Sequence, residues 1–159
     1  MNTENFDIVV IGGGPGGYVA AIRAAQLNKK VALIEMEQLG GVCLNWGCIP
    51  TKALLKSAET FQKIQHADSF GIKVSKVEFD IRKIVQRSRD ISYKLSEGVK
   101  SLLKKNKITL INGVASFHSN KILTVKNNDK EKLVQANNII IATGARPKVL
   151  NGFEPDGNL

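Results

Sequence analysis

The chain has 159 residues, a length typical of one domain with a single hydrophobic core. With 43% hydrophobic and 23% charged residues, 14 glycines and 4 prolines, its composition excludes a disordered or fibrous protein. The net charge of +9 lies wholly within residues 56–159, which hold 19 basic and 10 acidic side chains without a recognisable nucleic-acid motif, so we expect a solvated lysine-rich surface rather than a nucleic-acid site.

The first elements in chain order predict a βαβ unit. Residues 6–11, F-D-I-V-V-I, form a short β-branched run that ends at glycines, which is typical of a strand buried on both faces. A helical stretch follows the glycines to about Leu27, and a second apolar run covers residues 31–34 before Glu35. Strand, tight turn, helix and strand in this order form a βαβ unit.

Two further helices and several strands are predicted after this unit. One helix runs from Pro50 to about His66, and residues 67–79 form a connection with a short extended piece. Asp80 can cap a longer helix that ends near Asn106. The apolar face of this helix is expected to comprise Ile81, Ile84, Val85, Ile91, Leu95, Val99 and Leu102. Strands are expected at residues 108–111, 114–117, 122–125, 133–135 and 139–143, with a turn at 127–129.

The N-terminal residues and the cysteine count bear on location. Met1 to Asn5 are polar and lack the pattern of a secretory or transit signal, and no stretch approaches the ~20 apolar residues of a membrane span. Two cysteines are too few for the disulfide scaffold of a small secreted domain. We therefore expect a cytoplasmic protein without membrane contact.

A glycine-rich turn lies between the first strand and the first helix. Gly12, Gly14 and Gly17 match G-x-G-x-x-G, and Glu35 follows at the end of the next strand. In this context Gly12 permits the tight turn, Gly14 lets a pyrophosphate approach the helix N-terminus, and Gly17 lets the helix pack on the strand. Glu35 would accept hydrogen bonds from the adenosine ribose. The pattern predicts a dinucleotide site without separating FAD from NAD; the alternative is a turn that only packs a helix on a sheet.

Cys43 and Cys48 lie within G-G-V-C-L-N-W-G-C-I-P-T-K at residues 40–52. In a regular α-helix their Cα atoms would be ~8.6 Å apart, beyond the ~7 Å limit for a disulfide, so a bridge needs distorted backbone. Gly47 and Pro50 allow such a distortion. Pro50 also suits the first turn of a helix, whose positive end would stabilise a thiolate at Cys48. A close cysteine pair of this kind suggests redox chemistry.

Two other interpretations of the cysteines stay open. They could be buried structural thiols, or they could belong to a metal site completed by His66 and His118. The spacing differs from the usual metal-binding spacings and neither histidine is close in sequence, so no metal is predicted. Trp46 could shield a cofactor or fill a gap in the packing, and the sequence does not decide between these roles.

Residues 12–17, Glu35, residues 40–52 and A-T-G at 142–144 together resemble the N-terminal part of the flavoprotein disulfide reductases, over essentially the whole chain. Within that family the cysteine segment is most similar to that of the dihydrolipoamide dehydrogenases, rather than the glutathione or mercuric reductases. The resemblance implies that FAD binds this domain and that NAD⁺ is a co-substrate at a site outside the chain. It also implies a homodimer that oxidises dihydrolipoamide carried on the lipoyl domain of a 2-oxo acid dehydrogenase complex.

The same resemblance implies roles for individual residues. Cys43 and Cys48 would form the redox-active disulfide, with Cys43 exchanging with the dithiol substrate and Cys48 contacting the flavin. Lys52 would lie near flavin N5, where a cation stabilises the reduced ring; the alternative is a solvated lysine. Gly113 to Ala115 would border the adenine. The cofactor-binding residues implied in this way are Gly12, Gly14, Pro15, Gly17, Glu35, Met36, Gly41, Val42, Cys43, Cys48, Lys52, Gly113, Ala115, Ala142, Thr143 and Gly144.

The expected organisation follows from the elements and the resemblance. Residues 1–150 would form an α/β, Rossmann-like FAD-binding domain, in which a parallel sheet carries a small antiparallel β-meander and a long helical excursion. Residues 151–159 would be a linker toward an absent NAD-binding domain. The family's second glycine motif and its His-Glu acid–base pair do not occur here, so we expect the isolated chain to lack full turnover. The alternatives are a related flavin disulfide reductase of the glutathione or mercuric type and a non-catalytic nucleotide-binding module.

Overall fold

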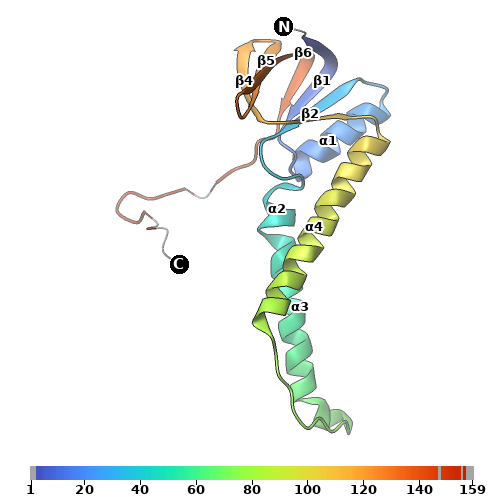
Figure 1. The fold of residues 1–159 in the computed structure, drawn as a ribbon, viewed down its shortest axis with the longest axis vertical. Coiled ribbons are helices and arrows are strands. Elements are labelled where there is room, and N and C mark those ends of the chain that lie inside the picture. The colour runs from blue at the N-terminus through green and yellow to red at the C-terminus, as the bar shows by residue number, and fades with distance from the viewer. Residues whose placement is uncertain (1–2, 147, 155, 157–159) are drawn as a thin grey trace.

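A single six-stranded sheet forms the body of the domain (Figure 1). The computed structural model describes residues 3–146, 148–154 and 156. The strands are β1 (Glu4–Ile11), β2 (Val31–Glu35), β3 (Thr109–Asn112), β4 (Val114–Ser119), β5 (Ile122–Asn127) and β6 (Lys130–Ile141). They lie in the order β3-β2-β1-β6-β5-β4, in which β3, β2, β1 and β6 are parallel and β6, β5 and β4 form an antiparallel meander. The predicted α/β fold with a small meander is confirmed.

The last two predicted strands, at residues 133–135 and 139–143, belong to one continuous strand, β6, except that Ala142 and Thr143 lie beyond its end. Its first half pairs with β5 as far as Gln135, whereas its second half pairs with β1 as far as Ile141. The polar residues between the two predicted segments stay extended because the register with β1 continues through them. One strand therefore joins the meander to the parallel part of the sheet, which the apolar pattern alone could not show.

Within the described residues, four α-helices and one 3₁₀-helix complete the fold. They are α1 (Pro15–Gln26), α2 (Gly41–Asn45), α3 (Cys48–Gln65), the 3₁₀-helix η1 (Ala67–Phe70) and α4 (Ile81–Lys105). The sequence did not predict α2 or η1, and residues 71–79 form a connection that holds neither a helix nor a strand. Asp80 caps α4 as predicted: its carboxylate accepts hydrogen bonds from the N–H groups of Arg82, at 2.9 Å, and Lys83, at 3.2 Å.

Hydrophobic clusters lie on both faces of the sheet. Successive side chains of a strand point to opposite faces, so Val9 belongs to one cluster and Val10 to the other. Helix α1 and the C-terminal part of α4 cover the second cluster, where Ala21 and Leu103 are buried beside Leu33. The parallel strands are therefore buried on both faces, as their almost unbroken apolar sequences predict.

Helices α3 and α4 extend side by side away from the sheet (Figure 1). The predicted apolar face of α4 is only partly a packing face: Val99 is buried, whereas Ile81 is 59% exposed. Smaller side chains, Ser88 and Ser92, are buried on the same helix instead. Small residues let two helices approach closely, so the larger apolar residues beside them stay at the rim of the contact. Among the helices of the described residues, none combines the length and the apolar character that crossing a membrane requires.

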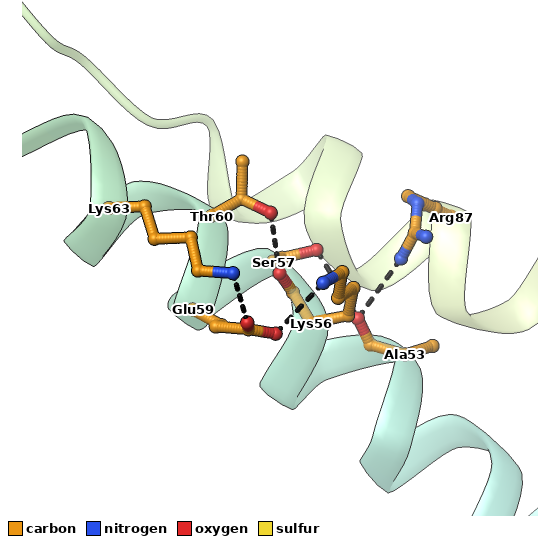
Figure 2. Close-up of polar contacts among 7 residues, drawn as sticks. All are labelled: Ala53, Lys56, Ser57, Glu59, Thr60, Lys63 and Arg87. Atoms are coloured by element: carbon orange, nitrogen blue, oxygen red, sulfur yellow. Dashed lines mark hydrogen bonds and ion pairs between the residues drawn. The ribbon is translucent and has the colours of Figure 1, made fainter. Parts of the chain in front are cut away.

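An ion-pair cluster on the surface of α3 provides a pH-dependent prediction (Figure 2). The Glu59 carboxylate lies 2.6 Å from the Lys63 ammonium and 2.9 Å from that of Lys56, and these contacts lower the pKa of Glu59 to about 2. A lowered pKa stabilises the fold at neutral pH, and this contribution is lost as the pH falls through about 2. We expect a carbon NMR titration of Glu59 at low salt to show this midpoint. High salt or Lys63→Ala should raise it, whereas a normal midpoint at low salt would contradict the ion pairs.

Candidate functional site

A cleft of about 560 Å³ lies where three parallel strands end. Gly12 follows β1, Glu35 ends β2 and Ala142 follows β6, and all three line the cleft. The carboxyl ends of parallel strands are where doubly wound sheets bind their ligands. The lining residues are Gly12, Gly14, Pro15, Glu35, Met36, Glu37, Gln38, Gly41, Val42, Cys43, Trp46, Ala142, Thr143, Gly144, Ala145 and Arg146. This volume is in the usual range for small-molecule and cofactor sites.

The glycine-rich turn brings backbone, rather than side chains, to one wall of the cleft. Gly12 has a φ of +104°, and a Cβ atom there would overlap the Ala142 carbonyl oxygen. A Cβ atom at Gly17 would overlap the Gly12 carbonyl oxygen, so α1 packs against the turn only without a side chain at this position. Gly14 lines the cleft, and its own Cβ would have ordinary space. Helix α1 therefore begins at the cleft, with its free N–H groups at that end.

Glu35 holds the turn in place with its carboxylate. Its Oε2 accepts a hydrogen bond from the Gly13 N–H at 2.6 Å, and its Oε1 accepts one from the Glu37 N–H at 2.8 Å. The sequence pointed to Glu35 only as a ribose acceptor, whereas the structure shows that both oxygens also bind backbone. A carboxylate oxygen can accept more than one hydrogen bond, so these contacts leave acceptor capacity toward the cleft.

The two cysteines lie on either side of a break between two helices. Cys43 belongs to α2, and Cys48 is the first residue of α3. A Cβ atom at Gly47 would lie 3.1 Å from the Val42 carbonyl oxygen, which already accepts a hydrogen bond from the Trp46 N–H at 2.9 Å. The chain can therefore turn tightly enough to bring the two side chains together. The backbone between the two cysteines is therefore not a regular helix, which is the condition for a disulfide between residues at this spacing.

Both cysteines are free thiols, and the pKa of Cys43 responds to hydrogen bonding with the Cys48 side chain. The pKa of the Cys43 thiol is raised, chiefly by this hydrogen bond, and also by loss of water contact and by nearby charge on Cys48. The Cys48 backbone N–H and the positive charge of Lys52 act in the opposite direction. The surroundings of Cys43 therefore favour its protonated thiol.

Several predicted site residues lie outside the cleft lining. Lys52 is exposed and lines a separate depression on α3, although its charge acts on Cys43. Gly113, with a φ of +145°, donates its N–H to the Glu35 carbonyl oxygen at 2.9 Å, and Ala115 packs against the core beyond it. Gly17 lies beneath the turn, and Cys48 is exposed next to Cys43 but is not among the residues that line the cleft.

The cleft is also lined by residues that the sequence analysis did not select or whose role it left open. Trp46 is half exposed and faces the cleft, which favours contact with a ligand over filling a gap in the core. Arg146 lies just beyond the end of β6, and Glu37 and Gln38 lie just beyond β2. Residues that follow the carboxyl ends of parallel strands are candidates for any such fold, and that rule would have identified them.

The structure gives no support to the metal-site interpretation of the cysteines. Within the described residues there is no group of three His, Cys, Asp or Glu side chains that could hold a metal ion. His66 is exposed, and its Nδ1 lies 2.8 Å from the Gln62 carbonyl oxygen of its own helix turn. The chemistry of the site therefore rests on the cleft and the two thiols.

Comparison with known proteins assigns the family. A family model described as pyridine nucleotide-disulphide oxidoreductase matches residues 6–158. Over 155 residues the chain is 53% identical to a dihydrolipoyl dehydrogenase of Zymomonas mobilis, covering 97% of this chain and 33% of that protein. It is 49% identical to a protein of the same name from Chlorobaculum parvum, covering 98% and 34%, and 44% identical to one from Bacillus subtilis, covering 99% and 35%. The chain thus spans about a third of the length of the curated relatives that it matches. It belongs to the pyridine nucleotide-disulphide oxidoreductase family.

Proposed function

We propose that this chain is the FAD-binding, disulfide-bearing N-terminal part of a dihydrolipoamide dehydrogenase. One observation carries the proposal: Cys43 lines the same cleft as the glycine turn and Glu35. A dinucleotide on the turn would extend past the cysteine pair. The relatives named dihydrolipoyl dehydrogenase favour this assignment over the glutathione or mercuric reductases.

The residues of the cleft fit an FAD. Gly12, Gly14 and Pro15 would hold the pyrophosphate at the start of α1, because the wall is backbone there and a negative charge suits a helix N-terminus. Glu35 would accept the ribose hydroxyls. The remaining contacts would come from Met36, Gly41, Val42, Ala142, Thr143 and Gly144, which line the cleft, and from Gly113 and Ala115 near the adenine. When bound, FAD supplies a two-electron carrier between a dithiol and a nicotinamide.

The protein's own step in this chemistry is thiol–disulfide exchange at the cysteine pair. With Cys43 and Cys48 joined as a disulfide, one thiolate of a dihydrolipoyl group attacks Cys43 Sγ, and the S–S electron pair leaves on Cys48 Sγ. The second substrate thiolate then attacks the substrate sulfur of the mixed disulfide and releases Cys43. The substrate is oxidised to its cyclic disulfide, and the enzyme pair is reduced.

Two features of the structure support this division of roles. Cys48 is the first residue of α3, where the helix dipole favours the departing negative charge. The raised pKa of Cys43 favours its protonated thiol in the reduced pair. Lys52 adds positive charge beside the pair.

The remaining parts of the proposal concern the longer protein. NAD⁺ would bind outside this chain, and the acid–base residues would lie there as well. The enzyme would be a cytoplasmic homodimer, and it would take its substrate from the lipoyl domain of a 2-oxo acid dehydrogenase complex. Residues 1–150 would be the FAD domain and residues 151–159 the linker to the next domain; residues 155 and 157–159 lie outside the described part of the chain.

The test uses the purified chain, FAD and dihydrolipoamide. FAD binding would be followed by flavin fluorescence, and the thiols by alkylation and mass spectrometry before and after dihydrolipoamide is added to the oxidised protein. We expect one FAD per chain and the appearance of two alkylated cysteines. A chain that binds no FAD would contradict the cofactor assignment. FAD binding without reduction of the disulfide would favour a nucleotide-binding module instead.

A further inference from the structure

Helix α4 hydrogen-bonds both ends of the short helix that carries Cys43. The Ser96 hydroxyl donates to the Leu39 carbonyl oxygen, two residues before α2 begins, at 2.9 Å. The Arg89 guanidinium donates to the carbonyl oxygen of Asn45, the last residue of α2, at 3.3 Å. The two donors lie seven residues apart, which is about two helical turns, so they lie on the same side of α4.

The side chain of Asn45 ties the same two ends together. It is 4% exposed, and its amide donates to the carbonyl oxygens of Leu39 and Gly41, each at 3.0 Å. The Leu39 carbonyl therefore accepts from both Asn45 and Ser96. A helix of five residues has too few internal hydrogen bonds to be stable by itself, so these external bonds fix its position.

Helix α4 also supports α3, on which the second cysteine lies. Arg87 reaches from α4 to the Ala53 carbonyl oxygen of α3 at 3.0 Å, and Figure 2 shows this side chain crossing between the helices. Cys43 and Cys48 lie on two different helices, α2 and α3, which are connected by the non-helical residues Trp46 and Gly47. Arg87 contacts α3 five residues beyond Cys48, whereas Arg89 and Ser96 contact the two ends of α2 itself, so the bonds from Arg89 and Ser96 act most directly on the position of Cys43.

The placement of α2 matters for the redox pair because a disulfide has a narrow geometry. The two sulfurs must approach to about 2.05 Å, with a Cβ–S–S–Cβ dihedral near 90° in magnitude. The more often the reduced protein holds the thiols near this arrangement, the higher their effective concentration toward each other and the more stable the disulfide. Support at both ends of α2 limits the rotation and sliding that would separate Cys43 from Cys48.

We propose that Arg89 and Ser96 are positioning residues that set the thiol–disulfide equilibrium of Cys43 and Cys48. The inference rests on the proposed redox function of the pair. The equilibrium to be measured is the reaction of the dithiol with oxidised glutathione, which yields the Cys43–Cys48 disulfide and two reduced glutathione molecules. Neither residue takes part in the exchange itself; each acts through the backbone of α2.

The experiment uses this chain in redox buffers of fixed glutathione ratio, with acid quenching, alkylation and mass spectrometry. Arg89→Met should lower the equilibrium constant for disulfide formation about tenfold, which is about 30 mV for a two-electron couple. Ser96→Ala should lower it by about threefold, because one neutral hydrogen bond is lost. Arg89→Lys, which keeps a cationic donor, should lie between Arg89→Met and the parent chain.

Two matched controls are available on the same helix. Arg87→Met removes an equivalent arginine-to-carbonyl bond, but from α3 beyond the cysteine segment. Ser92→Ala removes a buried hydroxyl that has no hydrogen-bond partner among the described residues. Both controls should leave the equilibrium constant within about twofold of the parent value. Thermal unfolding of every variant would show whether stability and redox equilibrium change separately.

The outcomes separate this inference from the proposed function. A parent chain that forms no Cys43–Cys48 disulfide at any glutathione ratio would overturn the proposed redox function. The positioning role alone would be overturned if the parent chain forms the disulfide and the equilibrium constant for disulfide formation is the same in Arg89→Met and Ser96→Ala. An equal shift in Arg87→Met would do the same, because it would indicate general loosening of the helices. If Arg89→Met does not fold, Arg89→Lys and Ser96→Ala decide the question.

Discussion

Replacing Gly17 with alanine should lower the free energy of unfolding by about 3 kcal/mol or more, at the upper end of the usual range for overpacking. The added Cβ atom would overlap the Gly12 carbonyl oxygen, which is backbone and cannot rotate away. The Gly12 N–H is bonded to the Ile34 carbonyl oxygen at 2.8 Å, so the turn is also fixed on its other side. Helix α1 would have to move away from β1, and the wall of the cleft would move with it.

The neighbouring glycine supplies the matched control for this prediction. Gly16 lies in the same turn of α1 and is exposed, and among the described residues a Cβ atom there would meet no atom within 4 Å beyond its chain neighbours and the backbone of its own helix. Gly16→Ala should therefore raise the free energy of unfolding by about 0.5–1 kcal/mol, the usual gain for alanine over glycine in a helix. Urea unfolding followed by circular dichroism measures both changes. Similar stabilities for the two variants would show that the close approach at Gly17 does not limit packing.

The local pattern of the sequence was sufficient for most of the parallel half of the fold. Strand β1, the glycine turn, α1 and β2 each have a distinct signature in residue type or period, and neighbouring signatures agree with one another. Asp80 likewise marks the start of α4, because a carboxylate at that position satisfies free N–H groups of the first turn. These elements depend on contacts between residues that are close in sequence.

The features that the sequence did not predict depend on contacts between distant residues. Strand β6 is continuous because β1 and β5 pair with its two halves, and neither pairing can be inferred from residues 130–141 alone. The buried face of α4 includes serines because α2 and α3 approach closely there.

In the candidate site, too, short motifs could be recognised from the sequence, whereas contacts between residues far apart in the chain could not. The glycine turn, Glu35 and the cysteine pair could be selected by spacing, because each motif carries its chemistry within a short segment. Spacing could not show that the Glu35 carboxylate holds the turn itself, since Gly13 is 22 residues away in the chain. It also could not identify Arg89 and Ser96, which reach the cysteine segment across 44 and 57 residues.

The Glu35 carboxylate is expected to matter for both the stability of the fold and the binding of FAD. Glu35→Gln preserves the size of the side chain but replaces one of its two acceptor oxygens with an NH₂ group. That NH₂ group would face the backbone N–H of either Gly13 or Glu37, and two donors cannot form a hydrogen bond with each other. One of the two backbone donors would lose a charged acceptor, so we expect the free energy of unfolding to fall by about 2 kcal/mol. The ribose acceptor and the geometry of the phosphate turn would be impaired together. FAD affinity should therefore fall by more than tenfold, corresponding to a loss of at least about 1.4 kcal/mol.

Glu37→Gln is the control, because Glu37 lines the same cleft but contacts Glu35 through its backbone N–H, which the substitution keeps. It removes the same charge from the cleft, so any general electrostatic effect on a negatively charged ligand appears in both variants. We expect Glu37→Gln to change FAD affinity by less than about twofold and to leave stability within about 0.5 kcal/mol. Equal changes in FAD affinity for the two variants, measured by flavin fluorescence titration, would assign the effect to charge alone. A loss specific to Glu35→Gln would show that one carboxylate both shapes the turn and binds the nucleotide.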